Sequence, residues 1–167
     1  MDRRTLLLVT IAGFATSAVG KSLHAEEHND PALIKSMSDA KITLQQGLEA
    51  AAPQGRPISA KFELDDGKLQ LSVYTAKDGT FSEVIVDHES GKVTKTAPIT
   101  EGEDLTAAKA QSAAMAKAKS DLKSAVDKSA SGARAIGVTP ALKSGHASAS
   151  VTVLKGQQFQ TTEQSLE

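Results

Sequence analysis

The sequence predicts an α+β protein built from two tandem modules, each a helix packed on a three-stranded antiparallel β-meander. The first observation is an internal repeat, because a gap-free shift of 78 positions lays residues 41–89 over residues 119–167. The matched positions are mainly apolar or turn-forming, as core packing and chain reversal require. They include Leu44 with Leu122, Arg56 with Arg134 and Gly67 with Gly145. The second observation is the order of patterns, a helix followed by three strands, which favours a meander covered by that helix.

Residues 1–25 are predicted to be a signal peptide and leader. A basic start precedes an apolar stretch from Thr5 to Val19, which is shorter than a membrane span. The run from Asp2 to Leu7 also resembles a twin-arginine signal, so the twin-arginine and general secretory routes both stay open. Cleavage fits after Gly20 or after Ala25. We expect a periplasmic or secreted protein with no stable membrane span in its mature form.

Composition narrows the classes of partner and chemistry. The chain has 19 basic and 20 acidic residues and a net charge of −1, so it offers no basic surface for nucleic acid. Cysteine is absent, which excludes disulfides and thiol chemistry. Aromatic residues make up 3% of the chain, so the core must be aliphatic. Because a module of about 50–70 residues is marginal alone, we expect the two copies to pack into one composite unit.

The first module is predicted over residues 30–96. Asp30-Pro31 marks a helix start, with Asp as the cap and Pro in the first turn. A further helix is expected to begin at Thr43, which forms a capping box with Gln46. The segment Pro53–Gly55 ends it.

Three strand patterns complete this module. Residues 58–64 alternate between apolar and polar side chains, as do residues 69–73. Residues 81–86 form the third pattern. The turns are expected at Asp65–Gly67 and at Asp78-Gly79, a pair of residues that suits hairpins.

Residues 97–105 are predicted to be an acidic linker, and residues 106–167 a degenerate second module. Residues 106–130 are strong helix formers without Pro or Gly. The strand positions are filled by residues 134–142, 147–154 and 159–163. Pro140 replaces Phe62 of the first module, which indicates a sheet edge or a bulge.

Several spacings together carry a family resemblance. They are Leu44-x-x-Gly47-Leu48-x-x-Ala51, then Ile58-x-Ala60-x-Phe62-x-Leu64, the Asp66-Gly67 turn, and Val84-Ile85-Val86-Asp87-x-x-x-Gly91-Lys92-Val93. Residues 41–95 thereby resemble the PepSY domain, and residues 119–167 resemble it more weakly. Gly47 stands where the family usually has Ala, and the second copy lacks the Asp-x-x-x-Gly-Lys ending.

The resemblance implies a non-catalytic domain of bacterial exported and membrane-attached proteins, also found in propeptides of thermolysin-like metalloproteases. There it is thought to restrain or assist a peptidase, and it implies no catalytic residues. We therefore expect a protein-binding module, not an enzyme, that modulates or inhibits a secreted or envelope peptidase or another envelope protein. Contacts are expected at strand edges and the sheet face, by strand addition. The alternative is an exported metal-responsive or metal-buffering protein that uses His24, His28 and the acidic linker.

The segment from His24 to His28 fits the H-x-x-E-H string of zinc peptidases. It lies at the signal junction and outside the repeat, which favours a polar leader. If cleavage follows Ala25, His28 would stand third behind a free amine, an arrangement suited to Cu(II) or Ni(II). We assign no catalytic, cofactor-binding or metal-binding residues and expect no cofactor.

Three other groups of charged residues have structural explanations. Asp87, His88, Glu89 and Ser90 could form an acid/base set, but neighbouring strand residues point to opposite faces, which favours a solvated turn. Glu101, Glu103 and Asp104 lack the spacing of a calcium loop and are expected to cap the next helix. The Ala/Lys-rich segment 106–120 lacks a large apolar face, which favours a solvated helix over a membrane-surface one.

Arg56 and Arg134 recur at equivalent positions before the first strand of each copy. Either they close the helix–strand junction in both copies, or they present an edge that binds carboxylates.

Overall fold

The computed structural model describes residues 30–167, so the predicted signal peptide and leader, with His24 and His28, lie outside the described residues. The helical elements are α1 (Pro31–Ser36), the 3-10 helix η1 (Met37–Asp39), α2 (Leu44–Ala51), the 3-10 helix η2 (Ala52–Gln54), α3 (Gly102–Lys117) and α4 (Leu122–Ala130). The strands are β1 (Arg56–Asp65), β2 (Lys68–Lys77), β3 (Thr80–Val86), β4 (Val93–Ile99), β5 (Arg134–Lys143), β6 (His146–Lys155) and β7 (Gln158–Ser165). No helix in this part of the chain is long and apolar enough to cross a membrane.

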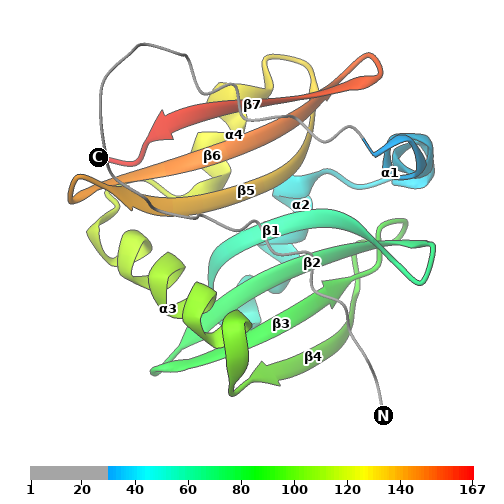
Figure 1. The fold of residues 1–167 in the computed structure, drawn as a ribbon. Coiled ribbons are helices and arrows are strands. Elements are labelled where there is room, and N and C mark those ends of the chain that lie inside the picture. Colours follow the sequence, from blue (N-terminus) through cyan, green and yellow to red (C-terminus); the bar gives the residue numbers. More distant parts are fainter. Residues whose placement is uncertain (1–29) are drawn as a thin grey trace.

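The strands form one seven-stranded antiparallel sheet in the order β4-β3-β2-β1-β5-β6-β7 (Figure 1). The prediction of two tandem modules, each a helix on its own three-stranded meander, is therefore wrong, although the protein is still a mixture of helices and strands. The two meanders form one sheet because β1 pairs with β5. The pairing removes two exposed strand edges that separate modules would leave open.

The 78-residue offset of the sequence recurs in the pairing of the strands. Arg56 pairs with Ala76 in the first hairpin, and Arg134 pairs with Leu154 in the second. The register shifts after Pro57 in β1 and after Ala135 in β5, again 78 residues apart. At the junction of β1 and β5, Ala60 pairs with Val138, its own equivalent. Two antiparallel strands that pair at equivalent residues are related by a local two-fold axis between those residues.

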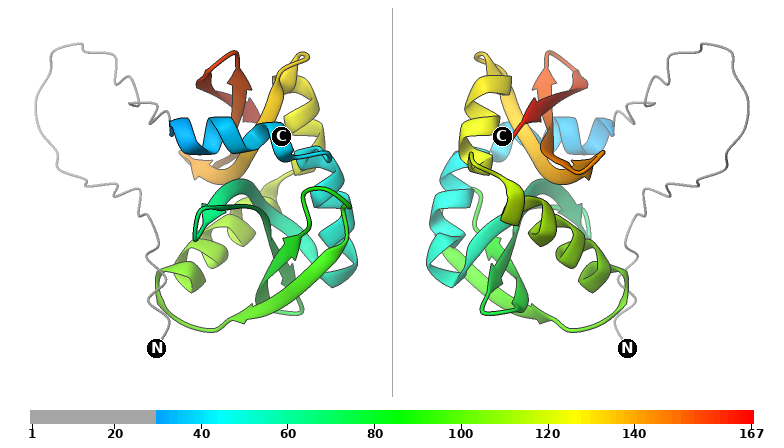
Figure 2. Two further views of the ribbon diagram at one scale, coloured as in Figure 1. Left: turned by 90° about the vertical axis from the view of Figure 1, so that its right-hand side faces the viewer. Right: turned by 90° about the vertical axis from the view of Figure 1, so that its left-hand side faces the viewer.

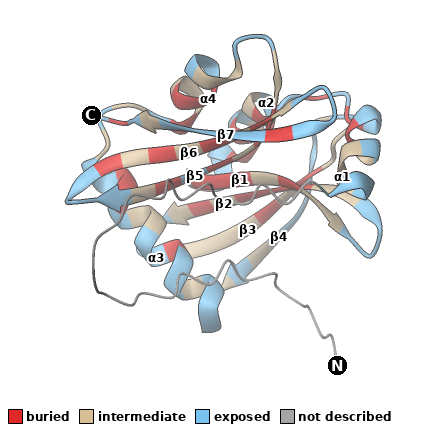
Figure 3. Ribbon diagram, turned by 45° about the horizontal axis from the view of Figure 1, so that its top comes forward, coloured by how far each residue is buried: buried red, intermediate tan, exposed pale blue. Residues whose placement is uncertain are grey.

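Helices α2 and α4 cover the same face of the sheet, behind the strands in Figure 1 (see also Figure 2). Helices α1 and α3 lie toward opposite ends of the molecule. The core is aliphatic and continuous through both halves, and buried positions concentrate on the central strands and the inner sides of the helices (Figure 3). Its largest fully buried side chains are those of Met37, Leu44, Ile58, Leu71, Met115 and Leu166, with six valines.

The helix starts follow the local sequence. The Asp30 carboxylate accepts hydrogen bonds from the amides of Ala32 and Leu33, which confirms the first predicted cap. Thr43 and Gln46 form the predicted capping box, so α2 begins where expected. The expected helical stretch 106–130 is instead two helices, because Asp121 caps a new one by accepting from the amide of Ser124.

Two further segments differ in detail from the sequence reading. Of the predicted linker 97–105, residues 97–99 complete β4 and the rest from Gly102 belongs to α3. Pro140 lies in β5, which is not an edge strand in the sheet order, and it pairs with Ala149 of β6. The β1–β5 ladder pairs at residues 137 and 138 only, so Pro140 lies beyond it. A missing amide donor is tolerated there because no β1 partner needs it.

Candidate functional site: the His88 pocket

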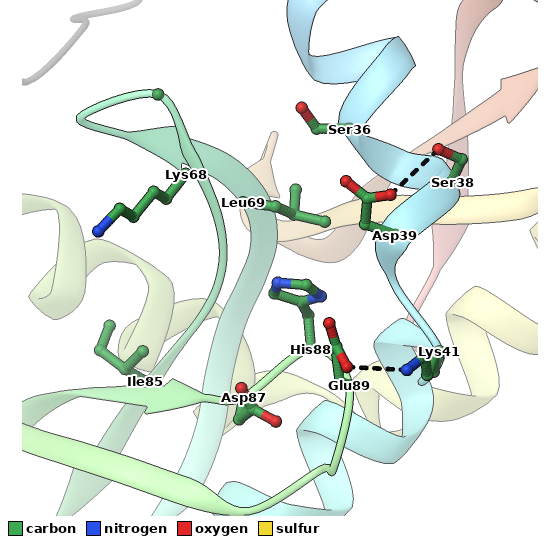
Figure 4. A pocket seen from close by; sticks show the side chains of 11 residues that line it. Ser36, Ser38, Asp39, Lys41, Lys68, Leu69, Ile85, Asp87, His88 and Glu89 are labelled. Atoms are coloured by element: carbon green, nitrogen blue, oxygen red, sulfur yellow. Dashed lines mark hydrogen bonds and ion pairs between the residues drawn. The ribbon is translucent and has the colours of Figure 1, made fainter.

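An open cavity of about 730 Å³ lies at one end of the sheet, and we call it the His88 pocket. Three segments that are distant in the sequence form its walls. They are residues 36–41 around η1, the β1–β2 turn at residues 67–69, and the end of β3 with residues 85–89. Figure 4 shows the imidazole of His88 in the middle of the lining residues, with Lys68 on one side and Asp39 on the other.

Backbone hydrogen bonds hold two of these walls together. The carbonyl of His88 accepts from the amides of Lys41 and Ile42, at 2.8 and 3.1 Å. After β3 the chain reverses in a turn, in which the amide of Gly91 donates to the carbonyl of Asp87 at 2.8 Å. Gly91 has φ 73°, a backbone conformation that glycine adopts without strain. The backbone of His88 is therefore fixed by the fold.

Two of the charged side chains are engaged with neighbours. The Asp87 carboxylate accepts from the amide and hydroxyl of Ser90 at 2.7 and 2.5 Å, and these bonds hold the pKa of Asp87 below its usual value. Lys41 donates to Glu89 at 2.8 Å, which lowers the pKa of Glu89 and raises that of Lys41. Both partners are largely exposed, so the pair adds little to stability.

Other polar groups of the pocket lack strong partners. The Nδ1 atom of His88 is buried and has no hydrogen-bond partner in the structure. The Asp39 carboxylate accepts only a long 3.5 Å bond from the Ser38 hydroxyl, and no ion pair within residues 30–167 involves Lys68. A buried polar atom without a partner costs roughly 1–3 kcal/mol. The charges of Asp39 and Lys68 are exposed and open to a ligand, whereas Nδ1 of His88 is closed off from solvent.

A second group of polar side chains, on β1 and β2, differs from the pocket because its members are hydrogen-bonded or ion-paired to one another. The hydroxyl of Ser72, which is fully buried, donates to Glu63 at 2.7 Å and accepts from Gln70 at 3.0 Å. Lys61 forms an ion pair with Glu63 at 2.6 Å. Burial, with the charge of Glu83 as a second cause, raises the pKa of Tyr74 above its usual value. These side chains satisfy one another, so this network has little need of a ligand.

Residues 87–90 were expected to form a solvated turn and not an acid/base set. Three of them, Asp87, His88 and Glu89, line the pocket, and their side chains do not converge. Asp87 is turned to Ser90 and Glu89 to Lys41, and neither is hydrogen-bonded to His88. The Ser38 hydroxyl donates to the carbonyl of Lys35 at 2.8 Å. Nucleophilic catalysis needs a hydroxyl within hydrogen-bond reach of its base. The hydroxyls of Ser90 and Ser38 contact the carboxylates of Asp87 and Asp39, but no hydroxyl among these residues is hydrogen-bonded to the imidazole of His88.

The acidic residues 101–104 lie at the start of α3. Glu101 occupies the N-cap position without a side-chain cap bond, and Glu103 and Asp104 stand in the first turn. Within residues 30–167, no group of three or more His, Asp or Glu side chains could hold a metal ion. The segment 106–120 buries Ala108, Ala114 and Met115 against the core. Its small residues therefore pack against the sheet.

The two repeated arginines are not equivalent in the structure. Arg134 donates through Nη2 to the carbonyls of Ala40 and Ile42 at 2.5 and 3.0 Å, so it ties β5 to the segment before α2. Arg56 is exposed. Arg134 therefore fits the hypothesis of a helix–strand junction better than that of a carboxylate-binding edge. The junction that it closes lies between the two halves and not within one copy.

Sequence reasoning missed the other charged residues of the pocket, Asp39, Lys41 and Lys68. Asp39 and Lys41 lie in one wall and Lys68 in another, and only long-range folding brings these walls together with His88. The repeat contained a signal that could have drawn attention to this site, because His88 of the first copy aligns with the apolar Leu166 of the second.

Comparison of the chain with family models, with curated proteins and with solved structures finds no match. The function of the protein is therefore inferred from the geometry of the His88 pocket and from the sequence patterns.

Proposed function

We propose that the protein is a non-catalytic, protein-binding protein of the bacterial periplasm that inhibits or otherwise modulates a peptidase or another envelope protein. The pattern of an export signal and the resemblance to the PepSY domain support this class of function. The observation that carries the proposal is the His88 pocket. It gathers an imidazole with an acidic and a basic side chain that lack strong partners, and no hydroxyl of its lining is hydrogen-bonded to the imidazole.

The pocket suits recognition because its walls are fixed before a partner arrives. His88 is held through its backbone, and Asp87 and Glu89 are held by Ser90 and Lys41. A preorganised site loses little conformational entropy on binding. Polar groups of a partner can then satisfy His88 and the two unpaired charges.

Strand addition at β4 is opposed by the sequence of that strand. Pro98 removes a backbone donor, and the register with β3 shifts between Ile85 and Val86. Prolines, bulges and lysines such as Lys95 are devices that protect sheet edges from pairing. The proposed contact surface is therefore the His88 pocket and not the β4 edge.

Affinity capture from a periplasmic extract tests the proposal. The wild type is compared with the double variant Asp39→Asn/Lys68→Gln and with the matched double variant Lys117→Gln/His146→Gln, which changes the repeat-equivalent positions in the second half. We expect a peptidase or envelope protein to be retained by the wild type and the matched variant, and lost by the pocket variant. The purified partner should then be inhibited by the wild type in a direct assay.

Failure to retain any such protein would contradict the proposal. Retention by all three proteins to the same extent would show that binding occurs elsewhere and would contradict the role of the pocket.

A further inference from the structure

The two halves of the molecule place different side chains at the same backbone position. The carbonyl of His88 accepts from the amides of residues 41 and 42, and the carbonyl of Leu166 accepts from the amides of residues 119 and 120. All three positions differ by 78 residues. The Met37 and Met115 side chains, also 78 apart, are both buried. The equivalence thus extends to η1 in the first half and to the end of α3 in the second.

In the second half this position is filled by an apolar side chain. Leu166 is fully buried in the core, together with Ala114 and Ala147, which correspond to Ser36 and Leu69 of the pocket. In the first half the same position holds an imidazole whose Nδ1 is buried without a partner. An apolar residue at this position is compatible with the fold, so the backbone does not require the polar one.

The surface contacts above this position also differ between the halves. In the second half Lys117 donates to the carbonyl of Gly145 at 3.4 Å, and His146 lies 2.9 Å from Glu167. In the first half the corresponding pairs are Asp39 with Gly67 and Lys68 with Glu89, and neither contact is formed. Asp39 has the opposite charge to Lys117, and Glu89 is paired with Lys41. The first half thus lacks both contacts that bridge the second.

We propose that the His88 pocket is a peptide-recognition site. It binds a polypeptide segment that presents a cationic side chain to Asp39 and an anionic group to Lys68, and that hydrogen-bonds to the imidazole of His88. This inference rests on the proposed function and names the chemistry of the partner segment. Two opposite charges on opposite sides of the cavity select a dipolar segment by electrostatic complementarity.

The remaining lining fits a peptide as well. Leu69 and Ile85 are partly buried and supply aliphatic contact for side-chain stems. The imidazole of His88 lies in the middle of the lining residues, where its ring can exchange a hydrogen bond with a backbone or side-chain group of the segment. The charges of Asp39 and Lys68 lie at the surface, where one ion pair changes the affinity for a peptide by only about two- to five-fold. Binding therefore depends on the combination of both charges with the imidazole.

NMR titration of the purified ¹⁵N-labelled protein tests this inference. The probes are blocked peptides in which arginine and glutamate are separated by one to four alanines, in both orders, and matched peptides with glutamine at both positions. We expect saturable shifts at the amides of Lys68, Leu69 and Glu89 with the charged peptides, and about tenfold weaker binding of the glutamine peptides. Asp39→Asn/Lys68→Gln should weaken binding to the level of the glutamine peptides.

The variant His88→Leu copies the second half. We expect it to raise the midpoint of urea unfolding and to abolish the peptide response, while Lys117→Gln/His146→Gln leaves the response within about twofold of the wild type. If His88→Leu does not fold, His88→Gln and the charge variants still decide the question. The absence of saturable shifts at about 10 mM peptide, or binding by the charge variant as tight as by the wild type, would overturn the inference.

The two proposals can fail separately. Peptide binding without capture of any envelope protein would support this inference and contradict the proposed function. Capture of a partner by the pocket variant, without a peptide response of the wild type, would overturn the inference alone.

Discussion

Gly47 on α2 and Leu71 on β2 show how a residue in one element limits the size of its neighbour. A Cβ atom added at Gly47 would lie 2.3 Å from Cδ2 and 3.2 Å from Cγ of Leu71, which is fully buried. The equivalent positions of the second half hold Ala125 and Ala149, both buried. A larger helix residue thus accompanies a smaller strand residue. This explains why the first copy has Gly47 where the second copy has Ala125.

The substitution Gly47→Ala is expected to destabilise the protein by about 1 kcal/mol. Overpacking against Leu71 costs about 1–3 kcal/mol, which exceeds the gain of up to about 1 kcal/mol in helix propensity. Leu71→Ala should cost about 2–5 kcal/mol through the cavity that it leaves. The double variant restores the pair found in the second half, so it should lose less than the sum of the two single variants. Urea unfolding of all four proteins gives the coupling energy, and strict additivity would contradict this explanation.

At the scale of elements, two equivalent helices begin with different caps. Thr43 caps α2 through its hydroxyl, and Asp121 caps α4 through its carboxylate. Hydrogen bonds from the hydroxyl and the amide of Ser124 hold the pKa of Asp121 below its ordinary value of 3.8. The contribution of a carboxylate with a depressed pKa is present above the unfolded pKa, and is lost as the pH falls through the folded one.

The substitutions Asp121→Ala and Thr43→Ala should therefore differ in their dependence on pH. Each is expected to cost about 1 kcal/mol at pH 7, since each removes an N-cap. The cost of Asp121→Ala should shrink as the pH falls below about 4, because the wild-type carboxyl becomes protonated. The cost of Thr43→Ala should stay constant over the same range. Thermal unfolding at several pH values measures both costs, and a constant cost for Asp121→Ala would be the contrary result.

Local patterns predicted many of these elements and missed others for identifiable reasons. The alternation in residues 58–64 and the Asp78-Gly79 turn located β1 and the β2–β3 hairpin, because side-chain direction and turn geometry are local properties. Strand β4 was missed because Thr, Lys and Pro obscure its alternation. The interruption of the 106–130 stretch depends on the bonds from the amides of Lys119 and Ser120 to the distant carbonyl of Leu166. The sequence pattern does not contain that contact.

At the scale of the whole molecule, two connections turn the duplicated meanders into one body. One is the pairing of Ala60 and Lys61 with Val138 and Gly137. The other is Arg134, which reaches the carbonyls of Ala40 and Ile42 in the first half. Both are long-range contacts, and although the repeat draws attention to Arg134, the sequence does not show which segment it reaches. The joined sheet and the His88 pocket could not be predicted for that reason, whereas the repeat itself could.

Arg134→Ala is expected to lower the free energy of unfolding by about 1.5–3 kcal/mol, because it removes hydrogen bonds from a charged donor. The matched variant Arg56→Ala changes an exposed residue and should stay within about 0.5 kcal/mol of the wild type. Urea unfolding measures both. Equal effects of the two substitutions would show that Arg134 does not hold the halves together.

The continuous sheet is tested most directly by following urea unfolding with two probes. Tyr74 is the sole tyrosine, tryptophan is absent, and Tyr74 lies in β2, so its fluorescence reports the surroundings of that strand. Far-ultraviolet circular dichroism reports the whole chain. A sheet joined through β1 and β5 predicts two transitions with the same midpoint and slope, as expected for one cooperative unit. A tyrosine transition that is separated from the dichroism transition would contradict it and would indicate two independent modules.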